Sequence, residues 1–142
     1  MLLENKIILI TGGSRGIGKA IAEKCLKDGA KVVIDYKNSC KKIETLVKEY
    51  GNDKIITYKA DVSNVDDVKQ MITYVKKVFG HLDGIVNNAG IITRTYDWKN
   101  ITLQDWNINI GTNLIGSWNV IRFGVDIMEK GGSIVNVSSI YG

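Results

Sequence analysis

Thr11-Gly12-Gly13-Ser14-Arg15-Gly16-Ile17-Gly18 is the stretch that decides the fold. It follows the apolar run 7–10 and precedes a helical pattern, so we expect a strand, a tight turn and a helix. Gly12 allows a sharp reversal, Gly16 allows backbone N–H groups to approach a diphosphate, and Gly18 allows the helix to pack closely on the strand. The spacing therefore predicts a dinucleotide site, with an ordinary strand-to-helix loop as the alternative.

The composition is that of one globular domain. The chain has 142 residues, 44% of them hydrophobic and 24% charged, which is enough for a single core, and we treat residues 1–142 as one domain. No apolar run approaches the ~20 residues of a membrane helix, and Glu4 and Lys6 interrupt the start, where a signal peptide would be apolar. We therefore expect no membrane association.

Cysteine spacing and charge exclude other classes of site. Cys25 and Cys40 have no metal-ligand or redox spacing, which predicts free thiols, no metal and a cytoplasmic location. The net charge of +4 comes from 19 basic and 15 acidic residues, and the basic ones are dispersed apart from the pairs 41–42 and 76–77. This pattern favours solvated helix faces over a nucleic-acid partner.

Apolar periodicity predicts alternating strands and helices along the whole chain. Such alternation is typical of a parallel sheet with right-handed crossovers, an α/β, Rossmann-like, doubly wound fold. Ser39 and Ser63 are expected to cap the helices that follow them. The expected strands are 7–10, 31–35, 55–58, 82–86 and 133–139, and the expected helices are 16–28, 39–50, 65–79 and 102–128, the last ended by Gly131-Gly132.

Five motifs in a fixed order carry a family resemblance: Thr11–Gly18, Asp61-Val62, Asn87-Asn88-Ala89-Gly90, Asn113-Leu114 and Asn136-Val137-Ser138-Ser139. With them, the chain resembles the N-terminal part of a short-chain dehydrogenase/reductase. The resemblance implies hydride transfer between a nicotinamide cofactor and a small carbonyl or alcohol substrate. The stretch 12–23 is most similar to the 3-oxoacyl-[acyl-carrier-protein] reductase branch, and sugar and alcohol dehydrogenases share much of it.

The resemblance also assigns cofactor-binding residues. Asp61 accepts a hydrogen bond from the adenine amino group, and Ser63, as the helix cap, leaves this carboxylate free. Asn88 ties the edge of the sheet to the neighbouring strand. The full set implied is Gly12, Ser14, Arg15, Gly16, Ile17 and Gly18 for the diphosphate loop, with Tyr36, Lys37, Asp61, Val62, Asn88, Ala89 and Gly90 around the rest of the cofactor.

We predict a preference for NADP(H), with NAD(H) possible. An acidic residue at the end of the second strand usually binds the ribose hydroxyls of NAD, but that position is Tyr36 here. Arg15 and Lys37 are expected to face a 2′-phosphate. Asp35, one residue earlier, points to the other face of the strand or swings round at the strand end.

Two residues are the catalytic candidates that the resemblance implies. Ser139 hydrogen-bonds the substrate oxygen, whereas Ser138 points to the other face of the strand. Asn113 lies within a helix, where asparagine is unfavourable. It helps to hold a water in the proton relay, and a solvent-facing polar position is the alternative.

The family's acid–base motif, Tyr-x-x-x-Lys, does not follow Ser139 within these residues. Tyr50 and Lys54 match the pattern by coincidence, and Tyr141 is too close to Ser139 to be the acid. We therefore expect a domain truncated after its fifth strand, inactive alone, from a full-length homo-oligomer. The source is a truncated chain, a broken gene or one half of something larger. A non-catalytic nucleotide-binding or partner-binding fragment is the alternative.

Overall fold

Five parallel strands form one sheet in the order β3-β2-β1-β4-β5. The computed structural model describes residues 1–93 and 97–140. The chain first builds outward from β1 to β3 and then crosses to β4, so the order reverses between β1 and β4, as in the predicted Rossmann-like fold. The strands are β1 (Ile7–Ile10), β2 (Lys31–Tyr36), β3 (Ile55–Lys59), β4 (Leu82–Asn87) and β5 (Met128–Asn136).

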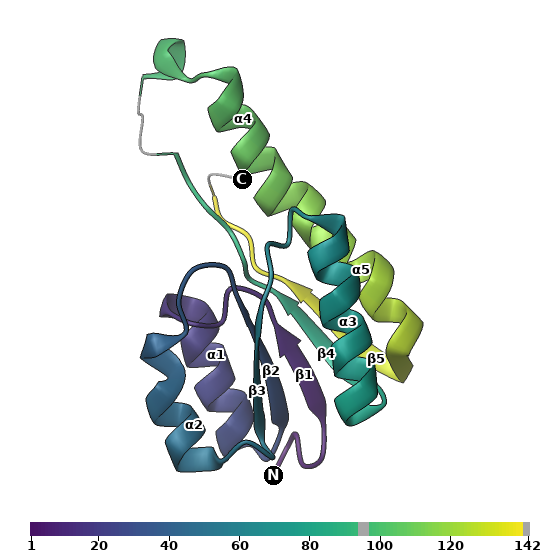
Figure 1. Cartoon of the computed structure of the whole chain (residues 1–142). Coiled ribbons are helices and arrows are strands. Elements are labelled where there is room, and N and C mark those ends of the chain that lie inside the picture. The colour runs from purple at the N-terminus through teal and green to yellow at the C-terminus, as the bar shows by residue number, and fades with distance from the viewer. Residues whose placement is uncertain (94–96, 141–142) are drawn as a thin grey trace.

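Helices cover both faces of the sheet (Figure 1). One face packs against α1 (Gly16–Lys27) and α2 (Glu44–Tyr50), and the other against α3 (Val65–Phe79) and α5 (Ser117–Gly124). All four residues of β1 are buried, because this strand has a neighbour on each side and helices on both faces.

The helix caps correct two predictions. Ser63 does not cap α3; Asn64 does, and its side chain accepts the N–H groups of Asp66 at 2.9 Å and Asp67 at 3.2 Å. Both residue types cap well, so the sequence did not separate them. Ser39 is also displaced from its expected role: its hydroxyl accepts the N–H of Lys41 at 3.3 Å, and a 3₁₀ turn over 41–43 precedes α2.

The long helix expected over 102–128 is broken into parts. A capping box of Thr102 and Asp105 begins α4 (Leu103–Asn109), which continues as a π-helix (Ile110–Gly116) and then as α5. The π-helix lies where the backbone comes close to the segment after β3, since a Cβ on Gly116 would lie 2.6 Å from Val62 Cγ2. In Figure 1, α4 projects beyond the carboxyl ends of the strands.

The fifth strand starts earlier than predicted. The helical segment ends at Ile127 and β5 begins at Met128, so the expected stop at Gly131-Gly132 and the strand 133–139 are both wrong in their bounds. Met128 pairs with Leu82 and Ser133 with Gly84, so the residues between form a bulge, with φ 89° at Gly131. Ser139 lies beyond the end of the strand.

Candidate cofactor site

A groove of about 810 Å³ lies at the carboxyl ends of β1, β2, β3 and β4. This is the edge at which ligands bind in doubly wound sheets. Every predicted cofactor residue except Gly18 lines it: Gly12, Ser14, Arg15, Gly16, Ile17, Tyr36, Lys37, Asp61, Val62, Asn88, Ala89 and Gly90. The groove also contains residues that the motifs did not assign, namely Asp35, Asn38, Ser39, Lys42, Ala60, Ile91 and Thr112.

The glycine loop needs its glycines for two different reasons. Gly12 has φ 61°, and a Cβ there would lie 2.8 Å from the Cα of Ala89, so the turn is both left-handed and crowded. Gly16 has φ 54° but no neighbour within 4 Å, which leaves the N-terminus of α1 open to the groove. A Cβ on Gly18 would collide with the side chain of Asn88, so this glycine permits close packing and does not line the groove.

Asn88 fastens β4 to the glycine loop, as expected. Its Nδ2 donates to the carbonyl oxygens of Thr11 at 3.0 Å and Gly12 at 3.2 Å. The hydroxyl of Thr11 accepts the N–H groups of Asn88 and Ala89, both at 3.0 Å. These bonds fix the position of the loop relative to the sheet edge.

Asp61 is not left free, which corrects the prediction. Its Oδ1 accepts both the N–H of Ser63 at 3.0 Å and the hydroxyl of Ser63 at 2.6 Å. Its Oδ2 lies 2.5 Å from Nζ of Lys37. Partial burial acts to raise the pKa of Asp61, but the hydrogen bonds from Lys37 and Ser63 outweigh it and lower the pKa below its ordinary value.

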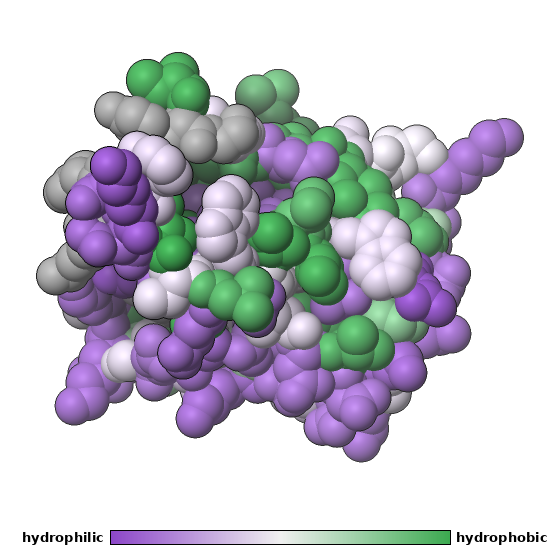
Figure 2. Space-filling model, turned by 90° about the horizontal axis from the view of Figure 1, so that it is seen from above, coloured by the Kyte–Doolittle hydropathy of each residue, from purple (hydrophilic) through white to green (hydrophobic). Residues whose placement is uncertain are grey.

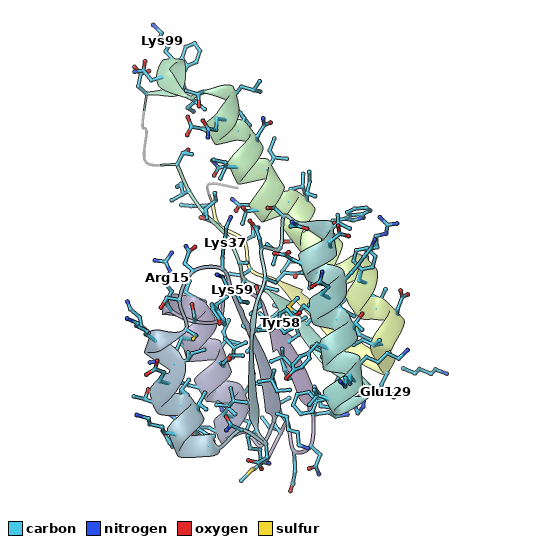
Figure 3. All side chains as sticks on the ribbon, in the orientation of Figure 1. Arg15, Lys37, Tyr58, Lys59, Lys99 and Glu129 are labelled. Atoms are coloured by element: carbon cyan, nitrogen blue, oxygen red, sulfur yellow. The ribbon has the colours of Figure 1, made fainter. Side chains whose placement is uncertain are left out.

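Cationic side chains reach the groove from three segments. Arg15 comes from the glycine loop, Lys37 from the segment after β2, and Lys42 from the 3₁₀ turn before α2. Figure 3 shows Arg15 and Lys37 at the same end of the sheet. Lys37 already pairs with Asp61, so it reaches a ligand phosphate only by leaving or sharing that carboxylate.

Asp35 lies inside the groove wall and does not swing out to the rim. Its side chain is 2% exposed, and its Oδ2 accepts the N–H of Gly12 at 3.4 Å. Burial raises the pKa of Asp35 to about 7, and the nearby Asp61 carboxylate acts in the same direction, whereas the Gly12 N–H opposes it.

The two catalytic candidates lie toward β5, at the same carboxyl edge of the sheet as the groove. Asn113 is in the π-helix, where its Oδ1 accepts the N–H of Ile91 at 2.9 Å and its Nδ2 donates to the carbonyl of Ile91 at 2.8 Å. Both ends of this amide are therefore used to hold the segment after β4. Ser139 follows β5, whose last residue, Asn136, pairs with Asn87 of β4. Tyr141 lies outside the described residues.

Comparison with known proteins decides the family. A family model described as short chain dehydrogenase matches residues 6–142. The chain belongs to this family. Its similarity to the 3-oxoacyl-[acyl-carrier-protein] reductase FabG of Staphylococcus aureus (strain N315) is 39% identity over 141 residues, which is 96% of this chain and 57% of that relative. The chain thus spans little more than half the length of this relative.

Two similar solved structures contain a nicotinamide cofactor. A short chain dehydrogenase from Burkholderia cenocepacia J2315, in complex with NADP, has a TM-score of 0.91 and 33% identity, and the match covers 99% of this chain and 58% of that one. A blue fluorescent protein from a metagenomic library, in complex with NADPH, has a TM-score of 0.91 and 29% identity, with the same coverage.

Some features of the groove had weak or no sequence signals. Lys42 follows β2 closely in the sequence and is a cation, but nothing in the sequence distinguishes it from Lys41.

Among the described residues, no group of His, Cys, Asp and Glu is arranged to hold a metal ion, and no helix is long and apolar enough to cross a bilayer.

Proposed function

We propose that the protein to which residues 1–142 belong is an NADP(H)-dependent oxidoreductase that reduces a carbonyl group, with 3-oxoacyl thioesters as the substrate class. The observation that carries this proposal is the groove, in which the glycine loop and three other strand ends bring together the residues that the family resemblance implies for the cofactor. The NADP and NADPH of two similar structures and the FabG relatives support it.

The groove residues fit a dinucleotide. The open N-terminus of α1 at Gly16 would hold the diphosphate, since unpaired N–H groups and the helix dipole favour an anion. Arg15 would face a 2′-phosphate together with Lys37 and Lys42, and Asp61 with Val62 would border the adenine. The bound nicotinamide would supply the hydride.

At the substrate end, Ser139 would donate a hydrogen bond to the carbonyl oxygen. Asn113 would act as a positioning residue, because its amide is engaged with Ile91 and holds the segment between β4 and the π-helix. A serine is no proton donor at neutral pH, so the family's Tyr-x-x-x-Lys would complete the chemistry. Residues 1–142 alone are expected to bind cofactor weakly and to turn over no carbonyl substrate.

The test is NADPH oxidation with a 3-oxoacyl thioester and a panel of simple ketones. The chain is assayed alone and with a family segment carrying Tyr-x-x-x-Lys, fused after residue 142. We expect turnover only with the added segment, a loss of roughly 10²-fold or more in Ser139→Ala, and a small effect in the matched variant Ser138→Ala. Turnover that survives Ser139→Ala would show that the chemistry is misplaced.

A second candidate, a partner-binding role, is favoured by exposed apolar side chains along α4, the π-helix and α5. Trp106 is 56% exposed, Leu114 66% and Trp118 53%. Viewed from above, hydrophobic residues spread across the middle and the upper part of the molecule, and hydrophilic residues line its lower border (Figure 2). We infer that this helical surface is where the full-length protein forms a homo-oligomer, and Trp118→Glu should then lower the molecular mass measured by light scattering.

A further inference from the structure

Asp35 is a buried carboxyl group in contact with the glycine loop, and the proposed chemistry does not use it. It is the last residue but one of β2, and its side chain is 2% exposed. Its Oδ2 accepts the N–H of Gly12 at 3.4 Å, and its main-chain carbonyl accepts the N–H of Gly13 at 2.9 Å. Asp35 therefore contacts both residues of the turn that must stay in place for a diphosphate to bind.

The surroundings of this carboxyl group disfavour its charge. Oδ1 has no hydrogen-bond partner among the described residues, so one oxygen is buried without compensation. Of the charged groups around the groove, Asp61 faces it from just after β3 with Lys37 paired to it. Arg15 is exposed on the glycine loop, and Lys42 is exposed in the 3₁₀ turn before α2. Burial first, and then Asp61, raises the pKa of Asp35 to about 7.

Neighbouring strands add no cation against this group. β1 consists of Ile7–Ile10 only. In the pairing with β3, Asp35 pairs with Tyr58, whereas Lys59 pairs with Tyr36, whose phenol has a pKa raised by burial and by Cys40. The backbone N–H groups of Gly12, Ala60 and Tyr36 favour the carboxylate, Gly12 through one long hydrogen bond, but no ion pair to Asp35 exists among the described residues and burial outweighs these donors.

We propose that Asp35 is a positioning residue whose protonation is linked to cofactor binding: the glycine loop accepts an anionic dinucleotide with Asp35 in its neutral form. This proposal rests on the proposed function, because it requires a diphosphate on the loop. A diphosphate at Gly16 and a carboxylate at Gly12 would place two anions around one turn, in a partly buried site where repulsion is strong. The neutral carboxyl removes that repulsion and keeps the Gly12 contact.

The linkage has a defined sign. An anion on the loop favours the protonated form of Asp35, so binding raises the pKa of this group further and takes up a proton near neutral pH. The affinity is then highest below the pKa of the free protein, about 7, and falls as the pH rises through it. A further rise of about one pKa unit corresponds to a loss of roughly five- to tenfold in affinity between about pH 6 and about pH 8.5.

The experiment is a fluorescence titration of the 142-residue chain with NADH at these two pH values. NADH is the probe because it lacks the 2′-phosphate, whose own ionisation near pH 6 would add a pH dependence. The variant Asp35→Asn keeps the size of the side chain and cannot ionise. Asp53→Asn, at an exposed carboxylate in the turn before β3, is the matched control.

We expect the dissociation constant of the native chain and of Asp53→Asn to rise about five- to tenfold, and that of Asp35→Asn to stay constant and close to the low-pH value. Calorimetry of the native chain in two buffers of different ionisation enthalpy should show proton uptake near pH 7, which keeps the test valid if Asp35→Asn misfolds. NADH binding that is independent of pH without proton uptake, or an unchanged slope in Asp35→Asn, would overturn this inference and leave the proposed function intact. A chain that binds neither NADH nor NADPH at any pH would contradict the proposed function, and this inference with it.

Discussion

β1 and β5 are both parallel strands of one sheet, yet their surroundings are opposite. β1 is buried along its whole length, between β2 and β4, and ends in the glycine loop. β5 pairs only with β4, and all its residues after Met128 are exposed, Val135 by 53%. The difference shows that the centre of the sheet, which carries the glycine loop, is enclosed, whereas β5 is an edge strand with exposed residues beside an apolar helical surface.

The largest expected difference between β1 and β5 is in how much replacing a glycine lowers the free energy of unfolding. Gly12→Ala should lower the free energy of unfolding by about 3 kcal/mol, because it adds a clash with Ala89 to a left-handed backbone. Gly131→Ala in the bulge of β5 has a similar φ but open space, so about 1 kcal/mol is expected. Urea unfolding followed by circular dichroism measures both, and equal losses would contradict the contrast between the regions.

Loss of the hydrogen bonds that hold the glycine loop to β4 should have the next largest effect on the free energy of unfolding. Asn88→Ala removes two hydrogen bonds to the carbonyl oxygens of Thr11 and Gly12, and we expect a loss of about 2 kcal/mol. Asn100→Ala, which removes one exposed bond to Asp97, is the matched control and should cost under about 0.5 kcal/mol. A similar value for both variants in the same urea assay would mean that Asn88 does not hold the loop.

The open edge of β5 should make the isolated chain associate. An unpaired strand edge with apolar side chains is a template for other chains, so light scattering should show species larger than a monomer. Val135→Lys should reduce the association by placing a charge on the exposed strand, while Val78→Lys on α3 should have little effect. A stable monomer of the native chain at high concentration would contradict this prediction.

A smaller effect is expected at the opposite end of β1. Asp83 accepts hydrogen bonds from Nζ of Lys6 at 2.8 Å and from the N–H of Ile7 at 2.9 Å. Partial burial acts to raise its pKa, but these two donors outweigh it and lower the pKa below the ordinary value. A depressed pKa in the folded state stabilises the fold at neutral pH, and this contribution is lost as the pH falls through that pKa.

Asp83→Asn should therefore cost about 1 kcal/mol at pH 7 and progressively less below about pH 4. The measurement is urea unfolding across this pH range, with Asp126→Asn as the exposed control. A loss in Asp83→Asn that stays constant on acidification would show that the carboxylate charge is not what stabilises this end of β1.

The sequence predicted most of the region from β1 to β4 and less of the region from α4 to β5. The glycine spacing and the apolar runs predicted β1, α1 and the glycine loop, because those features depend on local backbone needs and strand burial. The other predicted groove residues came from the family resemblance. The π-helix was missed because its cause is the packing of Gly116 against Val62, residues far apart in the sequence. The start of β5 was missed because Gly131 and Gly132 are typical of a helix end but here lie in a bulge.

For individual polar residues, too, the sequence pattern did not predict their contacts. Strand alternation indicated that Asp35 and Tyr36 point to opposite faces, but not that Asp35 is buried against Gly12. Two neighbouring residues, Ser63 and Asn64, were both good helix caps, and the choice between them determined the partners of Asp61. These outcomes depend on tertiary contacts that no local pattern contains.

The most direct test of the central claim is a fluorescence titration of the 142-residue chain with NADPH and NADH side by side. The proposed groove predicts that both bind and that NADPH binds more tightly, because Arg15 and Lys37 favour a 2′-phosphate. Lys37→Glu should weaken NADPH binding by roughly tenfold and NADH binding far less, while Lys77→Glu on exposed α3 should change neither. Equal or tighter binding of NADH, or NADPH binding that Lys37→Glu leaves unchanged, would contradict the proposed preference, and failure to bind either would contradict the assignment of the groove.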